Sequence, residues 1–480
     1  MEYLHSLGLI PAACGEKIQD IFAPATARHL LRGAGVAGIR AAEALSENDV
    51  GDFVIIEYQD RIGGRMHDVE FGEGPDGKPY IVEAGSNWVQ GTVTGDGPEN
   101  PINVLANKYN IITLAATICK VTDQDSLATF AAGGPFDFKY AIDEFNEALD
   151  KVLPDAGSLL QDRTLRATFR LHDWNPAKND SYRQTAEWWL FDGEFIYSLE
   201  ESSEIFTSVA ENATFNYFSE DNLFIYDQRG FATIVREEAK TFFGGNDDRL
   251  RLNTQVTRIE YGNDSHKVVG FNPPLPDWKV AAISSFELGT YTKVFMQFDE
   301  PFWDDVQYLI YADPETRGYY PEFQPLDMPG VLEGSGLLVA TVVNDHSYRL
   351  EAQSNEETQA EVMEVLRAMY GEDIPNPTHL WAYGSYSNWP PATSLQSHQN
   401  LRANLGNLFF AGETIGQEFF GYLQGAYLEG QYAGEFIASC LHGSGNCTLT
   451  DDQQNCPVLT GVTPYNLYNW NSGWFADTLA

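Results

Sequence analysis

The sequence has few cysteines and few basic residues. Its 480 residues include 5 Cys, and 69 Asp and Glu stand against 29 Lys and Arg, giving a formal net charge of −40. Five cysteines without a Cys-x-x-Cys pair exclude a disulfide scaffold and a cysteine-based zinc site. The excess of acid repels phosphates, so no nucleic-acid partner is expected, whereas a small cationic molecule would be attracted. The acidity also has a simpler explanation, which is solubility.

Long apolar runs and hydrolase motifs are also lacking. No run approaches the roughly 20 residues that cross a bilayer, so no membrane span is predicted. The segment Met1–Cys14 carries Glu2 where a secretory signal has basic residues. Neither G-x-S-x-G nor H-E-x-x-H occurs. Two features still favour a secreted protein. They are the close pair Cys447 and Cys456 and the sequons at Asn179, Asn212, Asn263 and Asn446. A cytoplasmic protein is the alternative.

A glycine-rich turn joins a predicted strand to a predicted helix near the start of the chain. The residues Gly33-Ala34-Gly35-Val36-Ala37-Gly38 match G-x-G-x-x-G, and a second apolar strand follows and ends at Glu57. Such glycines permit a tight turn, a close approach to pyrophosphate and close helix packing, while the acid suits ribose hydroxyls. We predict a dinucleotide site here. A glycine turn in another α/β domain is the alternative, and Arg32, at the end of a buried strand, does not fit the pattern.

Further motifs follow in order along the chain. They are Arg61–Arg65, Glu83–Gly91, Asp227–Gly230, Gly289–Phe295, Gly384–Pro390, Phe410–Thr414 and Gly421–Tyr427. Together with the glycine turn, this set resembles the flavin monoamine oxidase family, and within it the FAD-dependent polyamine oxidases and their fungal relatives. The resemblance covers roughly residues 30 to 441, far more than a single motif. It implies an α/β fold, with a Rossmann-like FAD-binding domain interleaved with an α+β substrate-binding domain of mixed sheet and helices.

The resemblance also implies domain limits. The FAD-binding domain would comprise residues 29–100, 205–265 and 395–441, and the substrate-binding domain residues 101–204 and 266–394. Residues 1–28 show no clear pattern, and residues 442–480 read as a polar tail.

Residue roles follow from the same resemblance. The cofactor FAD would be held by Gly33, Gly35, Val36, Ala37, Gly38, Glu57, Arg65, Gly85, Ser86, Asn87, Trp88, Val256, Gly412, Glu413, Tyr422 and Leu423. Lys293 would reach flavin N5 through a water, although a strand lysine that points to solvent is the simpler reading. Tyr386 and Tyr422 would sandwich the amine, with Trp88 and Tyr197 nearby; ordinary core packing is their alternative.

The implied chemistry is amine oxidation with FAD. Hydride leaves the carbon next to nitrogen, the imine is hydrolysed to an aldehyde and an amine, and O2 reoxidises the flavin to give H2O2. An L-amino-acid oxidase of the same superfamily is one alternative, and it requires an arginine for the substrate carboxylate. A shortened product without FAD is another.

The sequence departs from the family pattern in three places. A hairpin and a strand are missing after Asp264, and the stretch before Gly384 is short, where Trp381 is the aromatic candidate. The positions aligned with the acids that grip distal amines hold Gln90 and Tyr197. A long polyamine is therefore not the expected substrate.

Overall fold

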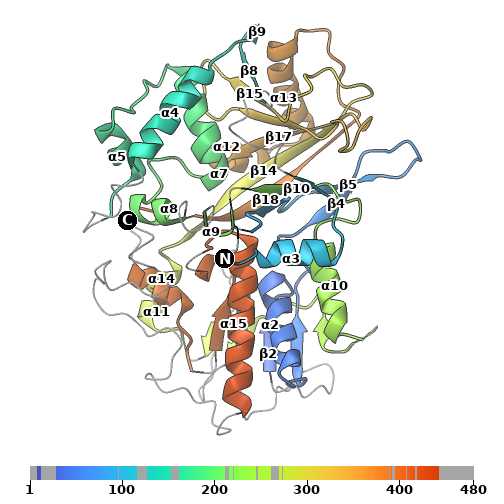
Figure 1. Cartoon of the computed structure of the whole chain (residues 1–480), viewed down its shortest axis with the longest axis vertical. Coiled ribbons are helices and arrows are strands. Elements are labelled where there is room, and N and C mark those ends of the chain that lie inside the picture. Colours follow the sequence, from blue (N-terminus) through green and yellow to red (C-terminus); the bar gives the residue numbers. More distant parts are fainter. Residues whose placement is uncertain are drawn as a thin grey trace.

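The structure is a computed structural model of the whole chain (Figure 1). It describes residues 8–11, 29–93, 95, 97–115, 127–152, 162–210, 216–219, 221–244, 247–260, 270–272, 274–388, 390–391, 395–406, 408–416 and 419–442. Cys447, Cys456 and the sequons at Asn212, Asn263 and Asn446 lie outside the described residues. The sequon at Asn179 lies in an exposed turn.

One half of the molecule, at the bottom of Figure 1, is built on a five-stranded sheet in the order β11-β3-β2-β1-β19. The strands are short and mostly apolar, as expected for a sheet buried on both faces. They are β1 (Gly8–Pro11), β2 (His29–Arg32), β3 (Phe53–Ile56), β11 (Leu250–Arg251) and β19 (Leu408–Ala411). The strand β3 runs parallel to β2 and β11, whereas β1 runs antiparallel to β2 and β19.

Helices from both ends of the chain cover one face of this sheet, and α2 and α15 lie side by side (Figure 1). A side chain on Gly430 would place its Cβ 2.3 Å from the Ala37 carbonyl oxygen, and one on Gly434 would lie 2.5 Å from that of Ala41. The glycines therefore let the two backbones touch. The helices of this half are α2 (Val36–Glu47), α3 (Pro101–Lys108), α10 (Thr233–Phe242), α11 (Asp277–Ile283), α14 (Leu395–Arg402) and α15 (Leu423–His442).

The strand β1 fills the sheet between β2 and β19. Leu9 lies opposite both Phe410 and Arg32. No pattern was predicted for residues 1–28, whereas the structure has a strand there that joins β2 to β19 in the described sheet. The departure predicted after Asp264 falls largely outside the described residues.

We expect Leu9→Pro to lower the melting temperature by several degrees, because proline removes a backbone N–H from a strand that is paired on both sides. Leu9→Val keeps the N–H and is the matched control. Equal melting temperatures for the two variants in a thermal unfolding experiment would contradict the strand assignment.

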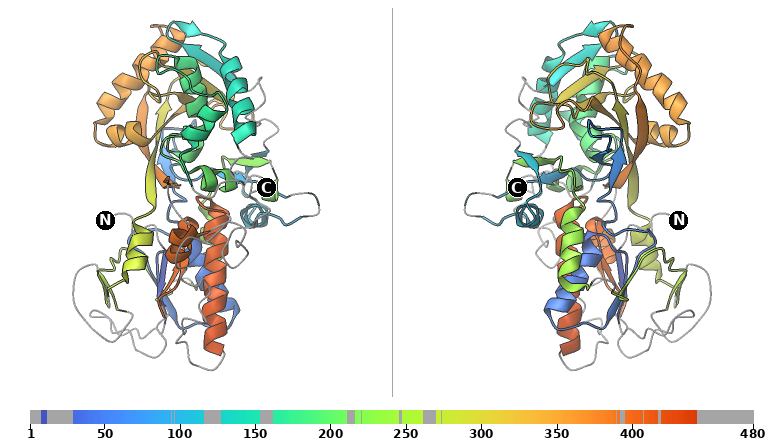
Figure 2. Two further views of the ribbon diagram at one scale, coloured as in Figure 1. Left: turned by 90° about the vertical axis from the view of Figure 1, so that its left-hand side faces the viewer. Right: turned by 90° about the vertical axis from the view of Figure 1, so that its right-hand side faces the viewer.

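The other half is built on a seven-stranded sheet in the order β18-β14-β17-β16-β15-β8-β9. Figure 2 shows the two halves stacked along the long axis of the molecule. The strands are β8 (Leu127–Ala131), β9 (Gly134–Pro135), β14 (Glu287–Gln297), β15 (Tyr308–Ala312), β16 (Glu322–Pro325), β17 (Leu337–Val343) and β18 (His379–Asn388). The predicted mixed sheet is thus confirmed.

The helices of this half include a π-helix. They are α4 (Lys139–Val152), α5 (Leu165–Leu171), α6 (Ser181–Glu187), the π-helix η3 (Trp188–Asp192), α7 (Gly193–Phe195), α8 (Glu204–Ala210), α12 (Asn344–Glu351) and α13 (Asn355–Tyr370). The helix α13 begins with a Ser354–Glu357 capping box and buries Val362, Val365, Leu366 and Met369 on one face.

Small elements connect the halves. They are β4 (Asp68–Phe71) with β5 (Tyr80–Glu83), β6 (Trp88–Gln90) with β10 (Asn222–Ile225) and β7 (Thr113–Ala115), β12 (Arg258–Glu260) with β13 (Gly270–Asn272), α9 (Asn216–Phe218) and the 3-10 turn η5 (Glu413–Ile415). Across the described ranges, no helix combines the length and apolar character needed to span a lipid bilayer.

Candidate active site

The glycine turn after β2 leaves the N-terminus of α2 without a side-chain cap. Gly33 has φ +100°, and a Cβ on Gly38 would lie 2.0 Å from the Gly33 carbonyl oxygen. Gly35 is the N-cap of α2, and no side chain caps the helix or places an acid in its first turn. The first N–H groups of α2 are therefore left to an anion, which is the arrangement that binds pyrophosphate.

A second pair of glycines faces this turn. Gly63 pairs with Gly35 in an isolated bridge, and a Cβ on Gly64 would lie 3.1 Å from the Gly35 Cα. Both Gly63 and Gly64 have positive φ. These glycines bring the two loops together at the start of α2. A residue with a side chain in place of one of them would fill the space between the loops.

The Glu57 carboxylate ties the ends of β2 and β3 together. Its oxygens accept the Ala34 N–H at 2.7 Å and the Gln59 N–H at 2.8 Å, and the residue is buried. The Thr254 N–H donates to the Glu57 carbonyl, which brings the half-buried Val256 to this edge of the sheet. The two residues predicted for the ribose and the adenine therefore lie on adjoining segments.

Arg32 is half-buried at the end of β2. Burial lowers the pKa of its guanidinium, and the charge of Glu57 opposes that shift. The charged residue at the end of the predicted strand thus lies near the carboxylate of Glu57, which follows the neighbouring strand β3.

Glu413 joins the end of β19 to the first half of the chain. Arg65 Nη1 donates to Glu413 Oε1 at 2.6 Å, and the Gly421 N–H donates to Oε2 at 3.0 Å. The Thr414 hydroxyl donates to Oε1 at 3.0 Å. The buried carboxylate links two segments predicted to hold the cofactor, and Gly412 precedes it in the same turn.

The segment Gly85–Trp88 passes close under the backbone of Arg65. A Cβ on Gly85 would lie 1.8 Å from the Arg65 carbonyl oxygen. Ser86 Oγ is buried without a protein partner, which leaves a hydroxyl available to a ligand. The Asn87 carbonyl accepts the Ile225 N–H, and Trp88 packs against Phe224 with ring centroids 5.0 Å apart.

Lys293 is buried in β14 and does not face solvent. Its Nζ donates to the carbonyl oxygens of Gly85 at 2.6 Å and Glu83 at 3.1 Å. A β-bulge in the pairing of β14 with β18 lies between Thr290 and Lys293. Bulges are common beside active sites because they redirect a side chain. The simpler reading, a surface lysine, is wrong.

Buried carboxyl groups surround this lysine. Burial lowers the pKa of Lys293 to about 8, against the opposing charges of Glu83 and Glu322. Burial also raises the pKa of Glu83 to about 8 and that of Glu322 to about 7. Groups whose pKa values lie near neutrality in a buried site are suited to proton transfer.

Tyr422 and Glu194 bring the two halves of the molecule together. The Tyr422 hydroxyl donates to Glu194 Oε1 at 2.9 Å, and burial raises the pKa of this carboxyl group. Tyr422 directly precedes α15, whose first residue is Leu423. Glu194 was not predicted. The sequence alignment pointed to Tyr197, which is buried in an apolar cluster with Ile196 and Trp189.

The remaining predicted residues lie in or near β18 and β6. Tyr386 is in β18 opposite Gly289, and its side chain lies outside the described residues. Trp381 packs on Phe295 with ring centroids 6.1 Å apart, in the apolar cluster that Trp88 also contacts. Gln90 is half-buried at the end of β6. In the described part of the chain, no group of three or more His, Cys, Asp or Glu residues is placed to hold a metal ion.

Comparison with known proteins gives consistent matches. The family described as "Flavin containing amine oxidoreductase" matches residues 36–271 and 265–435. The chain is 32% identical to polyamine oxidase 1 of Zea mays over 472 residues, which cover 86% of the chain and 90% of the plant protein. It is 32% identical to polyamine oxidase 7 of Oryza sativa subsp. japonica over 463 residues, covering 85% and 94%. The two matched segments meet where the chain is shorter than the family pattern.

Solved structures share the fold. Wild-type putrescine oxidase bound to putrescine has a TM-score of 0.64 at 17% identity, covering 85% of this chain and 98% of that one. Cyclohexylamine oxidase from Brevibacterium oxydans has a TM-score of 0.61 at 17% identity, covering 86% and 98%.

Proposed function

The chain belongs to the flavin-containing amine oxidoreductases, and on this basis we propose that it oxidises a diamine or a short polyamine whose second ammonium group pairs with Glu194. The chain is an FAD-dependent amine oxidase of α/β fold. FAD, when bound, supplies the acceptor for the hydride that leaves the carbon next to nitrogen. Three features of the site fit such a dinucleotide. They are the start of α2, which no side chain caps, the two facing glycine loops and the Ser86 hydroxyl, which has no hydrogen-bond partner among the described residues.

The protein's own residues orient the amine and handle protons. The buried Lys293 Nζ, held by two backbone carbonyls, has a pKa of about 8 and can gain or lose a proton at neutral pH. The Tyr422 ring supplies an apolar wall and cation–π attraction for an ammonium group.

The contact between Tyr422 and Glu194 carries the proposal. A half-buried carboxylate beside an aromatic ring recognises a cationic nitrogen through a charge-assisted hydrogen bond. The plant relatives are named polyamine oxidases, and the formal net charge of −40 draws cations towards the protein. Gln90 is neutral, so we assign the distal ammonium group to Glu194, which suits a short chain better than a long polyamine.

The same contact argues against an L-amino-acid oxidase. The Tyr422 hydroxyl donates to a carboxylate, and a second carboxylate on the substrate would be repelled there. A shortened product without FAD is not favoured either, because the described sheet is continuous and the glycine cradle is intact.

The test is peroxide release from a panel of substrates at one pH. Putrescine, spermidine and spermine are compared with a monoamine of the same chain length as putrescine and with free L-amino acids. Purified protein should be yellow from bound FAD, and kcat/KM should be highest for putrescine or spermidine. Equal values for diamine and monoamine would refute the proposed specificity, and turnover of amino acids alone would favour the alternative.

Glu194→Gln is expected to lower kcat/KM for putrescine about 10- to 100-fold, because it replaces an ionic hydrogen bond by a neutral one. The matched monoamine should lose less than about 3-fold, since it has no second ammonium group. Glu201→Gln is the control, because Glu201 lies in the same segment and is exposed. A loss of the same size for both substrates would show that Glu194 does not distinguish them.

A further inference from the structure

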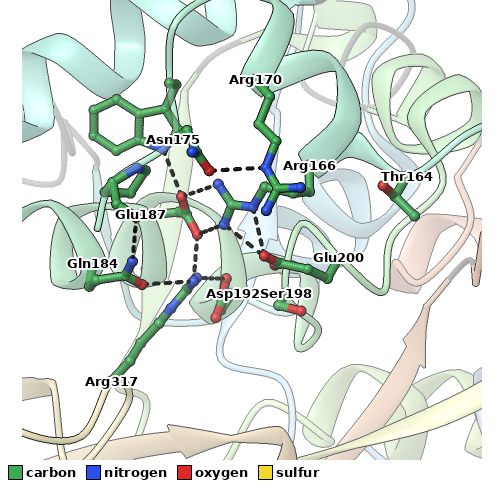
Figure 3. A network of polar contacts seen from close by, with 12 residues as sticks. Thr164, Arg166, Arg170, Asn175, Gln184, Glu187, Asp192, Ser198, Glu200 and Arg317 are labelled. Carbon is green, nitrogen blue, oxygen red and sulfur yellow. Dashed lines mark hydrogen bonds and ion pairs between the residues drawn. The ribbon is translucent and has the colours of Figure 1, made fainter. Parts of the chain in front are cut away.

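A network of buried ions lies beside the segment that carries Glu194. Figure 3 shows the carboxylates of Glu187 and Asp192 at the guanidinium group of Arg317, with Arg166 on the other side of Glu187. Arg317 comes from the connection between β15 and β16, and its Nη2 donates to Asp192 Oδ1 at 2.6 Å. Its Nη1 donates to Glu187 Oε1. The Glu187 side chain is fully buried.

Glu187 also accepts hydrogen bonds from Arg166 and Trp174. Arg166 Nη1 donates to its Oε2 at 2.9 Å, and the Trp174 indole N–H donates to the same atom at 2.7 Å. Arg166 Nε also reaches Glu200 at 2.7 Å. Glu187 is therefore held by both Arg166 and Arg317, whereas Asp192 is held by Arg317.

Arg317 bridges the two ends of the π-helix. Glu187 precedes Trp188, the first residue of η3, and Asp192 is the last residue of η3. Residues five apart on an α-helix point about 140° away from each other, at about 100° per residue. A π-turn, with its bonds from i to i+5, brings such residues to the same side. The fork of one guanidinium can therefore hold both acids only while this turn keeps its π geometry.

The turn decides where Glu194 points. Glu194 lies two residues beyond Asp192 in α7, and it receives the Tyr422 hydroxyl. If residues 188–192 relaxed to an α-helix, the following residues would rotate by about one position, or about 100°. Such a rotation would remove the Glu194 carboxylate from Tyr422.

The far end of the segment is also fixed. Ile196 has φ +69°, which is unusual for a β-branched residue, and it is fully buried. A Cβ on Gly289 of β14 would lie 2.2 Å from Ile196 Cγ2, so only glycine leaves room for it. Packing of this kind holds one end of the segment against the strand that carries Lys293, while Arg317 holds the other.

We propose that Arg317 is a positioning residue for substrate recognition: by bridging Glu187 and Asp192 it fixes the π-turn and so sets the direction in which Glu194 meets the distal ammonium group of the substrate. The inference rests on the proposed function for the role of Glu194. The Arg317 guanidinium group binds Glu187 and Asp192, so its effect on Glu194 passes through the π-turn.

The test uses Arg317→Met, which keeps the apolar stem and removes the guanidinium group. We expect KM for putrescine to rise at least about 10-fold, with kcat changed less than about 3-fold, because the distal contact acts in binding. The matched monoamine should keep its KM, and FAD should stay bound. Arg183→Met is the control, since Arg183 pairs with Glu144 and Asp180 at the surface of the same half.

A double-mutant cycle separates positioning from general destabilisation. If Arg317 acts through Glu194, Arg317→Met combined with Glu194→Gln should show the same putrescine KM as Glu194→Gln alone. Additive losses, or equal losses for diamine and monoamine, would overturn the inference. Asp192→Asn, which is isosteric and weakens one arm of the bridge, should raise KM for putrescine in the same direction and serves if Arg317→Met does not fold.

The two proposals can fail separately. If Glu194→Gln leaves the ratio of diamine to monoamine kcat/KM unchanged, the proposed function fails. If Glu194→Gln changes that ratio but neither Arg317→Met nor Asp192→Asn does, only the positioning role of Arg317 fails.

Discussion

Lys293→Met is expected to slow amine oxidation at least about 100-fold while FAD stays bound. The Nζ of Lys293 is buried and held by the carbonyls of Gly85 and Glu83, in the segment predicted to run past the flavin ring. General acid–base groups contribute about 10²- to 10⁴-fold, and methionine fills the space without a proton to exchange. Stopped-flow absorbance should separate flavin reduction from reoxidation, and the ratio of flavin to protein absorbance should not change.

Lys240→Met is the control, because Lys240 pairs with Glu237 on an exposed face of α10. Loss of FAD from Lys293→Met would instead make Lys293 a structural residue. The rate of the control should match that of the unmodified protein.

The pH dependence of flavin reduction supplies a second readout. In water a lysine is almost wholly protonated at pH 8, whereas burial lowers the pKa of Lys293 to about 8. The neutral amine that forms as pH rises through 8 can accept a proton, so reduction should accelerate there. This acceleration should be absent from Lys293→Met. Inflections from Glu322, with a pKa of about 7, and Glu83, with a pKa of about 8, should persist.

Glu413→Gln is expected to weaken FAD binding about 10- to 100-fold. The buried carboxylate receives Arg65, Thr414 and the Gly421 N–H, and the change leaves the arginine without its counter-charge. Breaking a buried ion pair costs about 3–5 kcal/mol, and less here because the Arg65 side chain is partly exposed. Titration of the apoprotein with FAD, followed by flavin fluorescence, measures the dissociation constant.

Glu435→Gln is the matched control, because Glu435 lies on the exposed face of α15 and accepts a hydrogen bond from Gln431. An unchanged dissociation constant for Glu413→Gln would remove Glu413 from the cofactor site.

Local pattern was enough to predict much of the fold. The glycine turn before α2, the amphipathic helix α13 and the apolar strand β17 each follow from spacing within about 10 to 20 residues. Segments of this kind carry their own signal, because one turn or one periodic face decides their structure. The motifs that suggested FAD are likewise continuous in sequence.

Other features depend on contacts between distant residues and could not be predicted. The strand β1 is held by partners in β2 and β19, and its own sequence shows no strand pattern. The π-helix was also not predicted from the sequence. Position in an alignment indicated Tyr197, whereas the residue that receives the Tyr422 hydroxyl is Glu194, three residues earlier. Gly193, directly before Glu194, was the one local sign of an irregular turn.

The close packing of α2 against α15 has a consequence for biosynthesis. Their contact joins an early and a late part of the chain, and the Asn48 carbonyl and the His442 ring that meet beside it are 394 residues apart. Until α15 leaves the ribosome, the face of α2 that packs against Gly430 and Gly434 has no cover, whereas the strands of the seven-stranded sheet have already been made. We therefore expect the half that is built on the five-stranded sheet to complete its folding after the other half.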